Sequence, residues 1–138
     1  MNLNRIIGEL IESEGLKLKP YKCTSGKLTI GIGRNLEDKG ITRKEAVELC
    51  NNDLIEVRNS LFRFAWYRHL DEVRQEAIIR MAFNMGVSDL LEFKKMIAAL
   101  ELKDWETAAY EALDSRWSTQ VGDRSIEIAE IIRSGRYK

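Results

Sequence analysis

Three residues whose side chains can do proton-transfer chemistry lie in one short stretch near the N-terminus: Glu14, Cys23 and Thr29. A carboxylic acid at the end of an apolar helix can donate a proton, because partial burial favours its neutral form. A cysteine acts as a base or a nucleophile only as its thiolate, and a threonine hydroxyl can hold a water molecule. Taken singly, the three are more typical of a surface acid, a small buried thiol and an ordinary strand residue.

The spacing of these residues carries more information than their types. Eight residues separate Glu14 from Cys23 and five separate Cys23 from Thr29, and Thr-Ile-Gly-Ile-Gly-Arg runs from Thr29 to Arg34. This pattern resembles the active-site signature of the phage-type, T4-lysozyme-like lysozymes (glycoside hydrolase family 24), which is a Glu, eight residues, an Asp or a Cys, five residues and a Thr. The similarity extends over nearly the whole chain, including Ala-Phe-Asn-Met-Gly at 82–86 and Ser-Arg-Trp at 115–117.

The resemblance implies a role for each of the three residues in cleaving a glycosidic bond. Glu14 would be the general acid, Cys23 the base or nucleophile, and Thr29 the group that positions a water molecule. Cys23 stands where other members have Asp, and a thiol with an ordinary pKa near ~8.5 is mostly neutral at pH 7. Lys22 and Lys27 would lower the pKa of Cys23 if they point at it. Two mechanisms therefore stay open, water activation with inversion and covalent attack by sulfur.

The resemblance also implies supporting residues elsewhere in the chain. Arg34 stands where the family has a His that pairs with an Asp on a long helix, so we expect an ion pair between Arg34 and Asp53. Arg124 matches the Arg that pairs with the catalytic acid, here Glu14. Each arginine could equally be a solvated surface group, which would contribute little to stability.

Two further positions match the residues that line the sugar cleft of the family, Phe83 and Asn84. Phe83 could equally be a core residue. Trp117 is more typical of a core anchor than of a sugar platform. His69, the only histidine, has neither metal-type nor triad partners nearby, so neither a metal nor a cofactor is expected.

The elements that must position these residues follow from periodicity. Apolar residues from Leu3 to Ile11 recur at helical spacing and predict an opening helix, which Gly15 would end. Residues 16–35 change period: Pro20 stops any helix, Thr24-Ser25-Gly26 is typical of a turn, and Leu28, Ile30 and Ile32 alternate as in a strand. We therefore expect a small hairpin or three-stranded sheet here.

The remainder of the chain is predicted to be helical. Thr42 and Glu45 form a capping box that begins a long helix, and Cys50 lies on its apolar face, which should hide it. Further helices are expected after the caps Asp71 and Asp104 and over residues 123–134. The predicted class is α+β, mainly α, in one domain of residues 1–138. A small β-containing lobe (12–41) and a helical lobe (1–11 and 62–138) would be joined by the helix 42–61.

The composition argues against nucleic-acid and membrane partners. The chain has 22 basic and 22 acidic residues, which argues against a nucleic-acid partner because such proteins carry a basic surplus. No apolar run approaches the ~20 residues of a spanning helix, and the N-terminus lacks the pattern of a signal peptide. Two cysteines do not make a disulfide framework. We therefore expect no stable membrane association and synthesis in the cytoplasm. The resemblance further implies a monomer made in a bacterial host, which reaches the cell wall after membrane permeabilisation.

The function that the resemblance implies is that of an endolysin. It would hydrolyse the β-1,4 bond between N-acetylmuramic acid and N-acetylglucosamine in peptidoglycan glycan strands and so lyse the host cell. One alternative is a lytic transglycosylase, which can work with a single Glu. A second is a non-catalytic peptidoglycan-binding module. A small helical regulator is disfavoured by the neutral charge and the glycine-rich strand segment.

Overall fold

The structure, a computed structural model, describes residues 1–137. Contacts divide them into two compact units, the first from Met1 to Glu48 and the second beginning at Leu49. A small antiparallel sheet in the first unit and helices in both confirm the predicted class, α+β with mostly helix. The lobe boundaries expected from the sequence, including the assignment of residues 1–11 to a helical lobe, stay predictions.

The first unit opens with helix α1 (Leu3–Glu14), as the apolar periodicity predicts. The side chain of Asn2 caps it by accepting a hydrogen bond from the backbone N–H of Arg5 at 3.0 Å. Gly15 ends it, since its N–H donates to the carbonyl of Ile11 at 2.9 Å. Glu14 is therefore the last residue of the helix.

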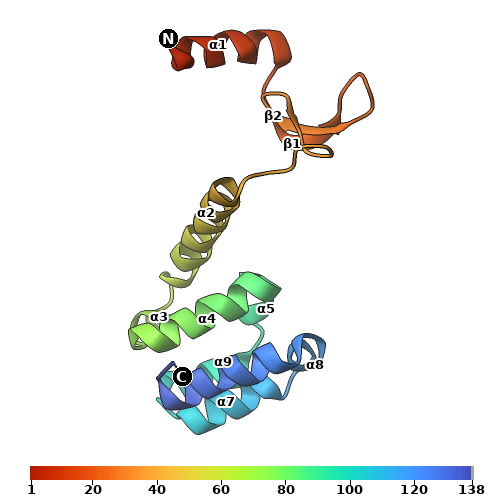
Figure 1. Cartoon of the computed structure of the whole chain (residues 1–138). Helices are drawn as coiled ribbons and strands as arrows, with labels where there is room; N and C mark the ends of the chain where they lie inside the picture. Colours follow the sequence, from red (N-terminus) through yellow and green to blue (C-terminus); the bar gives the residue numbers. More distant parts are fainter. Residues whose placement is uncertain (138) are drawn as a thin grey trace. The chain divides into compact units, whose positions relative to one another are not determined.

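A three-stranded antiparallel sheet follows, made of β1 (Lys17–Lys22) and β2 (Leu28–Gly31), both labelled in Figure 1, and β3 (Arg34–Asn35). Strand β2 lies in the centre. The register places Thr29 between Tyr21 on one side and Asn35 on the other. The pairing of β1 and β2 is irregular between Lys17 and Tyr21, where Pro20 lies. Because β1 is an edge strand, a residue without a backbone N–H is tolerated there.

The long helix α2 (Arg43–Leu61) begins at the predicted capping box. The backbone N–H of Glu45 donates to the hydroxyl of Thr42 at 3.1 Å, and the N–H of Thr42 donates to the Glu45 carboxylate at 2.9 Å. These two bonds satisfy N–H groups that have no partner inside the helix. Both the start of α2 and its length agree with the sequence prediction.

All the secondary-structure elements described in the second unit are helices. After the end of α2 its helices are α3 (Ala65–Arg68), α4 (Glu72–Met85), α5 (Val87–Leu90), α6 (Lys94–Glu101), α7 (Trp105–Leu113), α8 (Arg116–Val121) and α9 (Asp123–Ser134). Asp71 and Asp104 cap α4 and α7 as predicted, each accepting a backbone N–H at 3.2 Å. The predicted last helix, 123–134, agrees with α9.

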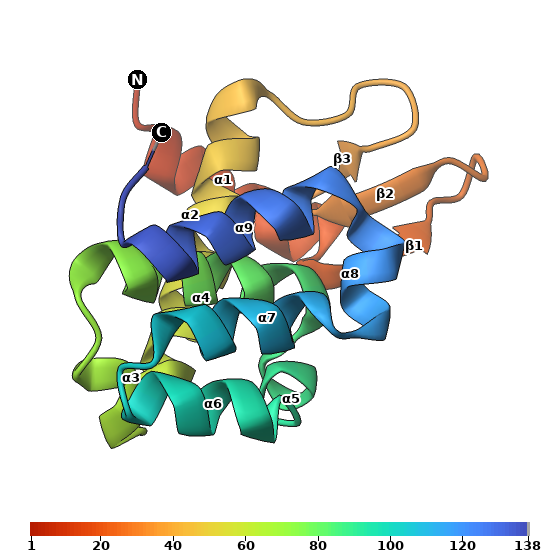
Figure 2. The same cartoon turned by 90° about the horizontal axis from the view of Figure 1, so that it is seen from below.

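The core of this unit lies where α4, α7 and α9 meet. Helix α7 lies between α6 and α9 (Figure 2), and α4 packs against α9. The side chains of Ile78, Met81 and Ile132 are fully buried. Burial of such side chains contributes roughly 1.5–3 kcal/mol each to folding, so this core holds the second unit together.

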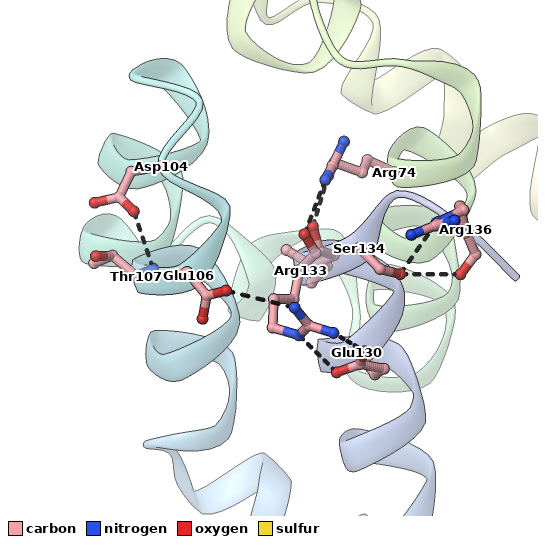
Figure 3. Close-up of polar contacts among 9 residues, drawn as sticks. Arg74, Asp104, Glu106, Thr107, Glu130, Arg133, Ser134 and Arg136 are labelled. Carbon is pink, nitrogen blue, oxygen red and sulfur yellow. Dashed lines mark hydrogen bonds and ion pairs between the residues drawn. The ribbon is translucent and has the colours of Figure 1, made fainter. Parts of the chain in front are cut away.

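One buried cation ties three of these helices together. Arg74 on α4 donates to the carbonyls of Ile132 at 2.6 Å and Arg133 at 3.0 Å, and so satisfies the C-terminal end of α9 (Figure 3). Its guanidinium also pairs with Asp71 at 3.0 Å and lies 3.8 Å from the ring centre of Trp105 on α7. Because its N–H groups bond to these carbonyls and its charge is paired with Asp71, the guanidinium of Arg74 can be buried without an unpaired charge.

None of the helices among the described residues is both long enough and apolar enough to cross a membrane.

Candidate active site

The first predicted site residue, Glu14, is positioned by the end of α1. Its side chain is exposed, so the first unit does not provide the partial burial expected from the apolar helix. The carboxylate lies against the turn between β2 and β3. A Cβ atom built on Gly33 would lie 3.9 Å from both the Cβ and the Oε2 of Glu14.

Glycine at position 33 serves this close approach in two ways. Its φ of 76° lies in the left-handed region, which side-chain-bearing residues adopt only at a cost. Its missing side chain also leaves the space beside the carboxylate open. The backbone of the Gly33 turn thus forms one wall beside Glu14.

Cys23 opens the tight turn that connects β1 to β2. The N–H of Gly26 donates to the Cys23 carbonyl at 2.8 Å, and the Cys23 N–H donates to the Lys27 carbonyl at 2.9 Å. The thiol lies 3.1 Å from the hydroxyl of Ser25, within hydrogen-bonding distance for sulfur. The predicted turn at Thr24-Ser25-Gly26 is therefore confirmed, and it brings a hydroxyl to the sulfur.

These contacts change the acidity of the thiol. The hydrogen bond with the Ser25 side chain, followed by those with the backbone of Lys27 and of Ser25, lowers the pKa of Cys23 from 9.0 to about 7. Hydrogen bonds to the charged form stabilise it. A substantial share of Cys23 is therefore thiolate at neutral pH, with Ser25 rather than a lysine charge as the largest cause.

Thr29 lies at the middle of the central strand β2 and is only 4% exposed. Its hydroxyl donates to the carbonyl of Lys27 at 2.9 Å, the same carbonyl that accepts the N–H of Cys23. One backbone carbonyl thus fixes Cys23 and Thr29 relative to each other. Because the hydroxyl proton is used in this way, the oxygen keeps its lone pairs for accepting a hydrogen bond from water.

Strand β2 and the turns at its two ends therefore connect all three predicted catalytic residues within the first unit. Cys23 lies in the turn before the strand, Thr29 in the strand, and Glu14 against the turn after it. The chemistry available is that of one carboxylic acid, one thiolate and one fixed hydroxyl.

The predicted ion pair between Arg34 and Asp53 is wrong. Arg34 instead binds Glu45, with its two terminal nitrogens 2.9 and 2.8 Å from the two carboxylate oxygens, and it also donates to the Gly40 carbonyl at 3.1 Å. The loop before α2 brings the first turn of that helix to Arg34, whereas Asp53 lies two turns further along. Both side chains of the Arg34–Glu45 pair are partly exposed.

Glu45 is the shared acceptor of this arrangement. The bonds from Arg34 and from the backbone of Thr42 lower the pKa of Glu45 from 4.5 to about 2. Arg34 directly follows Gly33, so the ion pair holds one end of the turn beside which Glu14 lies. The sequence predicts Glu45 as half of a capping box, but no feature of the sequence indicates that Glu45 also pairs with Arg34.

In the second unit, the structure brings Phe83, Asn84 and Arg124 together around one cavity of about 250 Å³. Trp117 also lines it and donates its indole N–H to the Asn84 side-chain oxygen at 2.8 Å. Trp117 is 7% exposed, which confirms its prediction as a core anchor. It also fixes the amide of Asn84 in one orientation, a role that the sequence did not indicate.

Cys50 lines the same cavity but is exposed. The expectation that the apolar face of α2 hides this thiol is therefore wrong. Helical periodicity identifies the apolar face, but it does not say how completely neighbouring elements cover each position. The expected pairing of Arg124 with Glu14 stays a prediction.

Comparison with known proteins supports the resemblance to the phage-type lysozymes that the sequence motif indicates. Residues 11–131 match the Phage lysozyme family. The chain is 34% identical to "Probable T4-type lysozyme 1" of Dictyostelium discoideum, over 88% of this chain and 89% of that protein. It is 29% identical to "Pre-baseplate central spike protein Gp5" of Enterobacteria phage T4, over 97% of this chain but 28% of that protein. It is also 28% identical to "Endolysin" of Acyrthosiphon pisum secondary endosymbiont phage 1, over 76% of this chain.

The end of α1 carries Glu14, the turn before β2 carries Cys23, and β2 itself carries Thr29. Together with the family match over residues 11–131, these residues define the class of protein as that of the lysozyme-type glycoside hydrolases. The chain belongs to the phage lysozyme family.

Proposed function

We propose that this chain is a muramidase of the endolysin type. It hydrolyses the β-1,4 bond between N-acetylmuramic acid and N-acetylglucosamine in peptidoglycan, and this activity lyses a bacterial host cell. One observation carries the proposal: the Lys27 carbonyl accepts hydrogen bonds from both the Thr29 hydroxyl and the backbone N–H of Cys23, whose thiol has a lowered pKa. Lys27 directly precedes β2, and the turn at the far end of that strand lies beside Glu14. The relatives named as lysozymes and endolysin support the substrate class.

Glu14 acts as the general acid. Cleavage of a glycosidic bond requires a proton on the leaving oxygen while positive charge develops at the sugar carbon. Glu14 is the carboxyl group that lies beside the Gly33 turn, where the absence of a side chain leaves room for a substrate. The gain expected from such proton donation is typically 10²–10⁴-fold.

Cys23 acts as the base or as the nucleophile. As a thiolate it takes a proton from water, which then attacks the sugar carbon from the face opposite the leaving group and inverts its configuration. Alternatively, sulfur attacks the carbon directly and water later displaces it, which retains the configuration. In both routes Thr29 accepts a hydrogen bond from the attacking water, because its own proton is already donated to Lys27.

Residues of the second unit bind the glycan. Phe83 supplies an exposed aromatic face, and Asn84, held by Trp117, offers its amide N–H groups to a sugar carbonyl or hydroxyl. Arg124 orients Glu14, and Arg34 supports the turn beside it through Glu45. The reaction needs no cofactor, and the enzyme acts as a monomer without nucleic-acid or membrane partners. Synthesis in the host cytoplasm precedes access to the wall through a permeabilised membrane.

A lytic transglycosylase is the second candidate, favoured by the absence of a carboxylate at position 23. Such an enzyme uses one acid and an internal hydroxyl of the muramyl sugar in place of water.

The test is mass analysis of the fragments released from purified peptidoglycan. Muramidase activity gives fragments ending in reducing N-acetylmuramic acid, with one water added for each bond cut. Fragments that end in 1,6-anhydro-muramic acid would select the transglycosylase. If no fragment is released while the protein sediments with the wall, the chain is a non-catalytic binding module.

A further inference from the structure

A hollow on the second unit takes no part in the proposed catalysis. It has a volume of about 580 Å³, within the range of small-ligand sites. It lies where α3 and the end of α6 are neighbours (Figure 2). Its lining includes Arg63, Phe64, Trp66, His69, Glu101 and Lys103. It shares no lining residue with the cavity formed by Phe83, Asn84 and Arg124.

Two aromatic rings form a fixed surface in this hollow. The planes of Phe64 and Trp66 are stacked, with ring centroids 6.2 Å apart and 26° between the planes. The indole also contacts the buried Tyr67 edge to face, with centroids 6.0 Å apart. The face of an aromatic ring is partially negative because of the ring's quadrupole, and it attracts the weakly positive C–H groups of a sugar ring. Because the rings are already held by neighbours, binding would order them at little further cost.

The charges around the hollow favour an anion. Arg63 lies over the Phe64 ring, with its guanidinium carbon 5.3 Å from the centroid. The backbone N–H of Lys103 is hydrogen-bonded, whereas its side-chain ammonium makes no hydrogen bond or ion pair with any residue that the structure describes. These two cations outnumber the acid Glu101, so a ligand that combines a sugar ring with a carboxylate matches the lining.

The backbone of Lys103 gives an independent indication that this side chain is not there for stability. Its φ of 57° is the only positive value outside glycine among the residues that the structure describes. The residue follows the end of α6, where its N–H donates to the carbonyl of Leu100 at 3.1 Å and the N–H of Asp104 donates to that of Ala99 at 2.9 Å. Glycine is the usual residue at such a helix end, and lysine pays a conformational cost there.

We propose that this hollow is an accessory site for an acidic glycopeptide segment of peptidoglycan. A sugar ring packs on the indole of Trp66, since Arg63 and Trp66 cover the ring of Phe64, and a carboxylate of the attached peptide binds Lys103 and Arg63. The identity of the polymer rests on the proposed function. The site keeps the enzyme on the wall between cuts.

The experiment measures binding of Glu14→Gln protein to purified peptidoglycan from which teichoic acids have been removed, so that the polymer is bound but not digested. In that background, Lys103→Gly should weaken binding about 5–10-fold while raising the melting temperature by ~1–3 °C, because glycine relieves the positive φ. Lys103→Arg should bind like the parent. Trp66→Leu, which keeps an apolar side chain, should weaken binding to a similar extent.

Lys95→Gln is the matched control, since it removes one positive charge from α6 at a position that lines a different hollow. It should bind like the parent. Parent-like binding by both Lys103→Gly and Trp66→Leu would overturn the proposal, as would binding seen only when teichoic acid is left on the wall. Hydrolysis is measured separately with Glu14 intact. If no bond is cut, the proposed function fails, but the binding measurements on the Lys103 and Trp66 variants still show whether the accessory site exists.

Discussion

The acidity of Cys23 provides the most quantitative prediction, and Ser25→Ala is the change that tests it. With a pKa of about 7, roughly half of the thiol is ionised at pH 7, whereas with the reference value of 9.0 the share would be ~1%. The Ser25 side chain is the largest cause of the lowering, and the backbone hydrogen bonds remain after its removal. We therefore expect the pKa to rise by ~0.5–1 unit, which reduces the thiolate share at pH 7 about 2–5-fold.

The assay is the rate of alkylation by iodoacetamide as a function of pH. Because Cys50 is also exposed, all proteins carry Cys50→Ser, so that only Cys23 reacts. The midpoint of the rate profile gives the pKa, and the rates of Ser25→Ala and its parent should converge above pH ~9.5, where both are fully ionised. If Cys23 is the catalytic base or nucleophile, the acid limb of wall-clearing activity should move upward with the alkylation midpoint.

Thr24→Ala is the control for this series, because Thr24 is an exposed residue of the same turn. Its midpoint should match that of the parent. Equal midpoints for the parent and Ser25→Ala, or a parent midpoint near 9, would refute the claim that the Ser25 hydroxyl stabilises the thiolate.

Three further predictions concern residues with distinct roles. Cys23→Asp should retain wall-clearing activity and lose sensitivity to alkylation, while Cys23→Ala should clear walls much more slowly. If Cys23→Ala clears walls as fast as the wild type, Cys23 has only a packing role. Glu45→Ala should lower kcat several-fold with little change in KM, since it releases Arg34 beside the Gly33 turn. The folded Asp53→Ala protein should keep the wild-type kcat. A loss of kcat in Asp53→Ala but not in Glu45→Ala would restore Asp53 as the partner of Arg34. Gly135→Ala should destabilise the fold by ~2–4 kcal/mol in urea unfolding, because the added Cβ would lie 2.6 Å from a guanidinium nitrogen of the buried Arg74 and φ is 70°. In an Arg74→Ala background the same change should cost only the ~1–2 kcal/mol of the left-handed backbone, and equal costs in the two backgrounds would disprove the clash.

The Arg34–Glu45 pair also predicts how stability depends on pH. The pKa of Glu45 is about 2 in the folded protein and 4.5 as its reference value. A lowered carboxyl pKa contributes stability that is complete above the reference value and is lost as the pH falls toward the folded value. The first unit should therefore lose this contribution between pH 4.5 and about 2, and Glu45→Gln should flatten that part of the stability profile measured by circular dichroism.

Much of the fold follows from local sequence signals. Apolar periodicity predicts α1, the Thr42–Glu45 box predicts the start of α2, and the Thr24-Ser25-Gly26 turn predicts the connection between β1 and β2. Each of these depends on residues a few positions apart, which is the range over which helix caps and turns are determined.

The errors concern contacts that no short-range pattern specifies. The partner of Arg34 depends on the path of the loop before α2, which places Glu45 rather than Asp53 within reach. The exposure of Cys50 depends on how far neighbouring helices cover α2. The thiol–hydroxyl contact of Cys23 and Ser25 depends on side-chain geometry within a correctly predicted turn.

The central claim is that this chain cleaves peptidoglycan with Glu14 as its general acid. The most direct measurement is the initial rate of turbidity loss of purified cell walls by Glu14→Gln, compared with wild type after circular dichroism has established that both are folded. The amide keeps the size and position of the side chain but cannot donate the proton, so the rate should fall ~10²–10⁴-fold. Wall clearing by folded Glu14→Gln at close to the wild-type rate would contradict the account.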